Sequence, residues 1–138
     1  MPEFLDLQSK TTKALRAVAE GAMRRHGLHL GQNHLLAMLW ERDGRTPGEI
    51  AAALHVTTPT VVKMATRMSA AGLLDRRRDD RLVRLWLTDA GRALRGPIEA
   101  ERRDLERRIT ADLTPEERAH LMTALEKIYK SASTILSQ

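Results

Sequence analysis

The sequence predicts a mostly α-helical fold that contains one small β-hairpin. Aromatic residues make up only 3% of the 138 residues, so Leu, Ile, Val, Ala and Met must build the core, and this composition favours helices. Apolar residues recur at helical spacing outside residues 73–87, where they alternate as in strands. Threonine–proline pairs occur at expected helix starts, and glycines occur at expected helix ends and turns. The elements follow in order from these three observations.

Two helices are expected before residue 46. The first, about Phe4–Arg25, carries one apolar stripe and ends at His26-Gly27, because glycine suits a helix C-terminus. The second, about Gln32–Arg42, ends at the turn pair Asp43-Gly44.

The next two helices begin at clear capping sequences. Thr46-Pro47-Gly48-Glu49 is a capping box with Thr46 as the N-cap, and it begins a short helix over Pro47–Leu54. Thr58-Pro59 repeats the order of cap and proline and begins a helix over Pro59–Ala71, which Gly72 ends.

A β-hairpin is predicted after Gly72. Residues 73–77 and 82–87 have strand-like spacing, and Arg78–Arg81 between them form a charged, turn-forming tip.

Two longer helices complete the pattern. Thr88 caps a helix of about Asp89–Asp112, which Gly96-Pro97 should kink. A further capping box, Thr114-Pro115-Glu116-Glu117, begins the last helix, about Pro115–Leu136.

This order of elements is that of a winged helix-turn-helix. The four-residue connection 55–58 suits a helix-turn-helix, whose second helix, Pro59–Ala71, has one apolar face that can pack on the first. The opposite face carries hydroxyl, aliphatic and basic side chains, which suit the major groove of DNA. We expect DNA contacts from Thr57, Thr58, Thr60, Val62, Lys63, Thr66 and Arg67.

The charge distribution favours this interpretation over an amphipathic helix that is merely solvated. A solvated face usually mixes Glu with Lys, but Asp and Glu are absent from the nineteen residues Val56–Leu74. Residues 63–84 contain seven basic and three acidic residues, and this difference of +4 is nearly the whole net charge of +5. Positive charge is therefore concentrated, as a surface that binds phosphates requires.

The predicted hairpin is rich in arginine, and such a cluster repels itself unless an anion neutralises it. We expect Arg77, Arg78 and Arg81 to contact DNA, with Arg81 entering the minor groove. Asp79 is interpreted as the partner that orients Arg81; the alternative is a charge-balanced exposed turn.

Three stretches resemble the hairpin of the multiple-antibiotic-resistance regulator (MarR) family. They are Leu73-Leu74-Asp75-Arg76-Arg77, Asp79-Asp80-Arg81 and Leu87-Thr88-Asp89-Ala90-Gly91, and the family pattern is Gly-Leu-hydrophobic followed by Asp-x-Arg and Leu-Thr-x-x-Gly. Glu49–Leu54 and Pro59–Val62 also resemble the family, and the similarity spans about Leu30–Leu94. One departure is a short wing, which should enter the minor groove less deeply.

The resemblance implies a sequence-specific, DNA-binding transcriptional regulator. It implies a homodimeric repressor on double-stranded DNA with a pseudo-palindromic operator. The repressor would be released when a small anionic or aromatic effector binds between the dimerisation helices and the winged domain. His34 and Trp40 on the second helix are the candidate effector-pocket residues.

The expected organisation is a single domain, residues 1–138. Residues 30–94 form the winged helix-turn-helix, and residues 1–29 and 95–138 form a helical dimerisation region. The last helix has a wide apolar face, which could pack within the monomer but exceeds what one small domain needs. The expected dimer contacts are Leu7, Leu121, Leu125, Ile128 and Ile135.

Several other classes of function are disfavoured. The chain has no cysteine, no apolar run of membrane-spanning length and no signal-peptide pattern at its start, so a cytoplasmic protein without membrane contact is expected. The five histidines lack metal-ligand spacing, and we expect neither a metal nor a cofactor. Phosphate loops and catalytic motifs are absent, which argues against an enzyme. The competing function is a winged-helix protein-interaction module, whose exposed helix face would be apolar or acidic.

Overall fold

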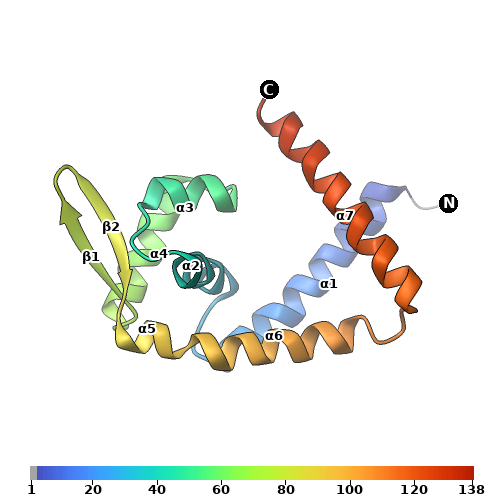
Figure 1. Cartoon of the computed structure of the whole chain (residues 1–138), viewed down its shortest axis with the longest axis horizontal. Coiled ribbons are helices and arrows are strands. Elements are labelled where there is room, and N and C mark those ends of the chain that lie inside the picture. The colour runs from blue at the N-terminus through green and yellow to red at the C-terminus, as the bar shows by residue number, and fades with distance from the viewer. Residues whose placement is uncertain (1–2) are drawn as a thin grey trace. The chain divides into compact units, whose positions relative to one another are not determined.

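The computed structural model describes residues 3–138, which divide after Glu101 into two compact units. The first unit contains five helices, a hairpin and the start of α6, and the second contains the rest of α6 and α7 (Figure 1). The predicted mostly helical fold with one small hairpin is confirmed. The elements are α1 (Phe4–Arg24), α2 (Leu30–Glu41), α3 (Pro47–Leu54), α4 (Thr58–Ala70), β1 (Leu74–Asp79), β2 (Leu82–Leu87), α5 (Asp89–Ala93), α6 (Arg95–Ile109) and α7 (Pro115–Leu136).

Helix α2 lies at the centre of the first unit. It contacts α1, α3, α4 and β2, and Figure 1 views it end-on among them. Its Leu35, Leu36 and Leu39 are fully buried, as are Ile50 of α3 and Leu85 of β2. Burial of aliphatic side chains from every element around α2 holds the helix-turn-helix and the hairpin to one core.

Helix α2 begins two residues earlier than predicted, because Glu20 of α1 and Gln32 of α2 accept hydrogen bonds from the backbone at its start. The Leu30 N–H donates to Glu20 Oε2 at 3.2 Å, and the His29 N–H donates to Gln32 Oε1 at 3.0 Å. The carboxylate of Glu20 thus satisfies a donor at the positive end of α2. Glu20 belongs to another helix, so the sequence near residue 30 does not predict this contact; the bond to Gln32 is local and was missed.

The predicted cap of α4 is wrong by one residue. Thr57, not Thr58, is the N-cap, because its side chain accepts from the Thr60 N–H at 3.3 Å. Thr58 is the first helical residue, and Pro59 occupies the second position, where its missing N–H needs no partner. The connection between α3 and α4 is therefore three residues, 55–57, and His55 adopts φ +56° there.

The hairpin is longer than predicted. Each strand has six residues, and Arg78 and Asp79 pair with Val83 and Leu82 instead of lying in the tip. Asp80 at φ +58° and Arg81 form a two-residue turn, and Asp is one of the few residues that tolerate this left-handed backbone.

The predicted helix over residues 89–112 is divided at Leu94 into α5 and α6, three residues before Pro97. Proline has no N–H for the carbonyl four residues earlier, that of Ala93, and its ring displaces that carbonyl. The helix therefore breaks one turn before the Gly96-Pro97 pair that predicted a kink.

The second unit, residues 102–138, consists of the rest of α6 and all of α7. Helix α7 has the predicted bounds, and Thr114 accepts from the Glu117 N–H at 3.1 Å as the capping box requires. Arg118 joins α7 to the end of α6 by donating to Thr110 Oγ1 at 2.8 Å and Glu106 Oε2 at 3.0 Å. All 22 residues of α7 are described, and none is buried. Across residues 3–138, no helix has both the length and the hydropathy that crossing a bilayer requires.

Candidate nucleic-acid interface

Helix α4 has one buried and one exposed face. Val61, Ala65 and Met68 are buried against the core. The expected DNA-contacting residues lie on the other side: Val62 is half-buried, and the exposed members are Thr57, Thr58, Thr60, Lys63, Thr66 and Arg67. The fold thus brings hydroxyl and basic side chains onto one accessible surface.

The threonines of this face also stabilise the helix that carries them. The hydroxyl oxygens of Thr57 and Thr60 lie 2.9 Å apart at the N-terminus of α4. The Thr66 hydroxyl donates to the Val62 carbonyl at 2.9 Å. The first turn of α4 contains no acidic residue, so the positive end of its dipole remains available to an anion.

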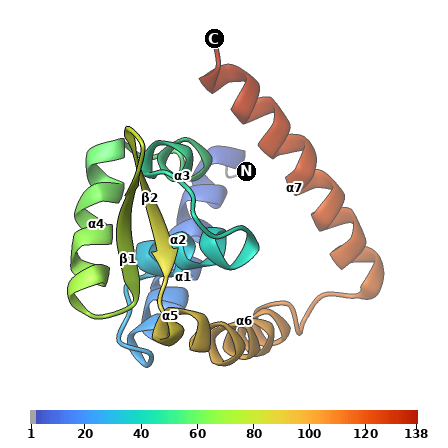
Figure 2. The ribbon, with the colours of Figure 1, turned by 60° about the vertical axis from the view of Figure 1, so that its left-hand side comes forward.

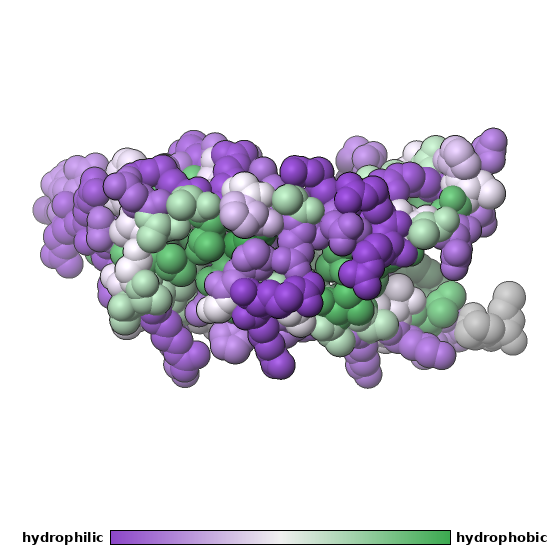
Figure 3. All heavy atoms as spheres, turned by 90° about the horizontal axis from the view of Figure 1, so that it is seen from below, coloured by the Kyte–Doolittle hydropathy of each residue, from purple (hydrophilic) through white to green (hydrophobic). Residues whose placement is uncertain are grey.

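The hairpin lies alongside α4, and β1 contacts it (Figure 2). Arg76 Nη1 is 3.5 Å from Thr66 Oγ1, so an arginine of β1 reaches the exposed face of α4. Hydrophilic side chains cover the end of the molecule where the hairpin tip lies, at the left of Figure 3. Helix and hairpin therefore present their polar groups next to each other.

The other face of the hairpin is occupied by contacts within the protein. The guanidinium of Arg77 lies 5.6 Å from the ring centroid of Trp86, and its Nη2 is 3.6 Å from Asp75 Oδ2. Arg84 donates to the Gly44 carbonyl at 2.9 Å, and its Nε is 3.7 Å from Asp79 Oδ2. The interpretation of Asp79 as the partner of Arg81 is therefore corrected: Asp79 pairs with Arg84, which faces it diagonally across the two strands.

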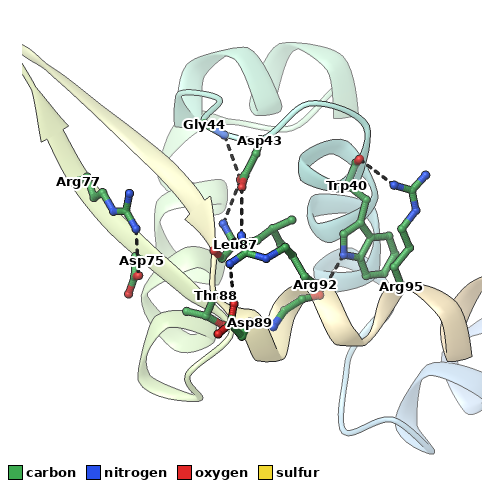
Figure 4. Close-up of polar contacts among 11 residues, drawn as sticks. Trp40, Asp43, Gly44, Asp75, Arg77, Leu87, Thr88, Asp89, Arg92 and Arg95 are labelled. Atoms are coloured by element: carbon green, nitrogen blue, oxygen red, sulfur yellow. Dashed lines mark hydrogen bonds and ion pairs between the residues drawn. The ribbon is translucent and has the colours of Figure 1, made fainter.

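Polar contacts fix the base of the hairpin (Figure 4). Asp43 Oδ1 accepts from the N–H groups of Gly44 at 3.0 Å and Leu87 at 2.9 Å. Arg92 donates to the Leu87 carbonyl at 3.1 Å and to Asp89 Oδ1 at 2.8 Å. The turn after α2, the end of β2 and the start of α5 are thereby joined, and no pattern in the sequence predicts these contacts.

Trp40 belongs to this junction. Its indole N–H donates to the Gly91 carbonyl at 3.0 Å, and Arg95 donates to the Trp40 carbonyl at 3.0 Å (Figure 4). His34 lines a cleft whose walls do not include Trp40, so these two candidate effector-pocket residues do not share this cleft.

That cleft lies in the first unit and has a volume of about 500 Å³. Arg16 and Glu20 of α1 and His34 of α2 supply its polar groups, and Leu54, Val56 and Met64 contribute apolar walls. Partial burial of Glu20 acts to raise its pKa, but the Leu30 N–H and His29 outweigh it and lower the pKa of this carboxyl. Glu20 is therefore ionised beside the cleft at neutral pH.

His26 and Arg25 meet at Glu101, a contact that their sequence separation concealed. The Glu101 carboxylate accepts from Arg25 Nε at 2.8 Å and hydrogen-bonds the ring of His26. These hydrogen bonds, from Arg25 and then His26, lower the pKa of Glu101.

Among residues 3–138, no three His, Asp or Glu side chains lie close enough to hold a metal ion.

Both the sequence and the fold are similar to those of known DNA-binding regulators. Residues 28–81 match the model of the MarR family. The transcriptional regulator TtmR of Methylorubrum extorquens (strain PA1), a helix-turn-helix type protein, is 35% identical over 77 residues, which are 54% of this chain. The aligned part spans only 40% of the length of TtmR.

Solved structures match over most of the chain. The MarR family protein Rv2887 of Mycobacterium tuberculosis, in complex with DNA, is 26% identical with a TM-score of 0.80, covering 93% of this chain and 98% of that one. The same protein in complex with salicylic acid is 27% identical with a TM-score of 0.73, covering 93% and 97%.

Proposed function

We propose that this chain is a sequence-specific, DNA-binding transcriptional regulator of the MarR family, whose model matches residues 28–81, rather than an enzyme. The observation that carries the proposal is the exposed face of α4, where threonines, Lys63 and Arg67 lie together in a stretch without any carboxylate. A carboxylate there would be repelled by phosphates, whereas these side chains hydrogen-bond phosphates and base edges. A protein-interaction module is not favoured, because its exposed face would be apolar or acidic.

The proposed complex places α4 in the major groove and the hairpin over the neighbouring minor groove. Thr57, Thr58 and Thr60 lie at the N-terminus of α4, which attracts a phosphate. Val62 can contact a thymine methyl group, and Lys63, Thr66 and Arg67 can reach phosphates or guanine edges. Arg78 and Arg81 extend the contact along the hairpin. In a homodimer the two α4 helices would meet a pseudo-palindromic operator about one helical turn apart.

Selection from a random duplex library, followed by fluorescence anisotropy with the selected sequence, tests the proposal. The triple variant Lys63→Ala/Arg67→Ala/Arg81→Ala should lose binding, since it removes three cations from the surface. The matched control Arg102→Ala/Arg103→Ala/Arg108→Ala removes three exposed arginines of α6 and should bind like the wild type. If the first variant binds as tightly as the wild type, or if no sequence is enriched, the assignment is refuted. The protein-interaction module would then be the better-supported function.

We further propose that the regulator is a repressor released by a small anionic or aromatic effector. The cleft beside His34 supports this, since Arg16 offers a cation for an anion and aliphatic side chains offer walls for a ring. Salicylate is a suitable probe, because it is the ligand of the Rv2887 structure. It should release the selected DNA from the wild type but not from an Arg16→Gln variant.

A further inference from the structure

The arginines of β1 fall on two faces of the hairpin. Successive residues of a strand point to opposite faces, so Arg76 and Arg78 share one face and Arg77 lies on the other. Leu74 shares the face of Arg76 and is buried where β1 contacts α4. The face of Arg76 and Arg78 is therefore the one next to α4.

The arginines on the α4 face keep their charge available. Arg76 reaches Thr66 Oγ1 at 3.5 Å, in the middle of the exposed face of α4. In the described part of the chain, Arg76 and Arg78 form no ion pair with any carboxylate, and both are exposed. Two uncompensated guanidinium groups on one strand face repel each other, and a row of phosphates would relieve that repulsion.

Arg77 has a different environment. Its guanidinium lies over the indole of Trp86 and beside Asp75, so its charge is already engaged. Trp86 in turn covers Gly44, where a Cβ atom would collide with the indole ring. Arg77, Trp86 and Gly44 thus form a stack between the hairpin and the turn that follows α2.

We propose that Arg76, together with Arg78, contacts DNA phosphates beside α4, and that Arg77 positions the hairpin through Trp86. The proposal rests on the proposed DNA-binding function. It assigns to Arg76 the DNA contact that was predicted from the sequence for Arg77. Because the two residues are neighbours with the same chemistry, they form a matched pair for experiment.

The experiment compares Arg76→Gln with Arg77→Gln on a mixed-sequence 30-bp DNA duplex. Fluorescence anisotropy gives the dissociation constant over about 50 to 200 mM salt, where the slope of log K against log salt counts phosphate contacts. Arg76→Gln should weaken binding about tenfold at the lowest salt and reduce the slope by about 0.9 for each contact removed. Arg77→Gln should keep the wild-type slope, because it removes no phosphate contact.

Thermal unfolding separates the two roles. Arg77→Gln should lower the melting temperature by a few degrees, and Arg77→Lys should restore it, because an ammonium group can also lie over the indole. Arg76→Gln should melt like the wild type. An unchanged slope for Arg76→Gln, or an equal loss of slope for Arg77→Gln, would overturn the proposal. Failure of the wild type to bind the duplex at low salt would instead refute the proposed DNA-binding function itself.

Discussion

Single residues decide how closely the hairpin approaches the helices around it. The base of the hairpin is held by the Leu73 carbonyl, which accepts from the Thr88 N–H at 3.1 Å. Gly91 lies against that carbonyl, where any Cβ atom would collide with the oxygen. The Leu-Thr-x-x-Gly pattern of the sequence therefore has a physical reason: Thr88 caps α5, and Gly91 lets α5 approach Leu73, the residue before β1.

Gly91→Ala should therefore destabilise the protein by about 2 kcal/mol, because the backbone must move to accept the methyl group. Urea unfolding at fixed protein concentration measures the change. Gly48→Ala is the matched control, since nothing lies within 4 Å of the added methyl group in α3. It should be neutral or stabilising by up to about 1 kcal/mol, because alanine favours a helix. Equal stability of the Gly91→Ala variant and the wild type would contradict the close packing at the base of the hairpin.

At the scale of elements, two helices with clear local capping boxes were predicted at their observed bounds, whereas the start of α2 was not. Thr46 and Thr114 cap the helices that follow them, and α3 and α7 have the predicted bounds. The start of α2 depends on Glu20, ten residues before Leu30 and in another helix. Strand-like spacing predicted the hairpin, but its tip was mistaken because Arg78 and Asp79 are charged yet pair across the sheet.

In the candidate site, too, features set by local sequence could be predicted and contacts between distant residues could not. Helical spacing is local information, so the sequence predicted which residues share the exposed face of α4. The contacts of Arg77 with Trp86, of Asp79 with Arg84 and of Trp40 with Gly91 depend on strand register and on packing between distant elements. None of these contacts leaves a periodic signal in the sequence.

The start of α4 provides a test at this scale, because two adjacent threonines compete for the role of cap. Thr57→Ala should cost about 1 kcal/mol of unfolding free energy, since the Thr60 N–H loses its acceptor. Thr58→Ala should cost less than about 0.5 kcal/mol, because Thr58 is the first residue inside the helix. Urea unfolding of both variants measures the difference. If Thr58→Ala lost more unfolding free energy than Thr57→Ala, Thr58 would be the N-cap, as predicted from the sequence.

At the scale of the whole molecule, charge and apolar surface are separated along the chain. Residues 63–84 hold a charge of +4, whereas α7 carries large exposed apolar side chains. Leu125 is 51% exposed and Ile128 is 40% exposed, on a helix without a buried residue. The second unit contains only the end of α6 and α7, too few residues to bury such a stripe by itself. In the proposed homodimer a second copy of the chain would cover this stripe, and the expected contacts at Leu7, Leu121 and Ile135 are likewise exposed.

A double substitution on the apolar stripe of α7 tests this dimer. Leu125→Asp/Ile128→Asp should yield monomers in sedimentation velocity, because two carboxylates would have to be buried without partners at the interface. The matched control is Thr123→Asp/Thr134→Asp, which adds the same two charges on the opposite side of the same helix and should remain dimeric. Circular dichroism of both variants verifies that α7 is still helical. A dimer that survives the first substitution would place the interface elsewhere, and a wild-type monomer would remove the homodimer from the proposed complex with DNA. Two linked α4 helices bind an operator far more tightly than one, so the monomeric variant should also lose high-affinity DNA binding.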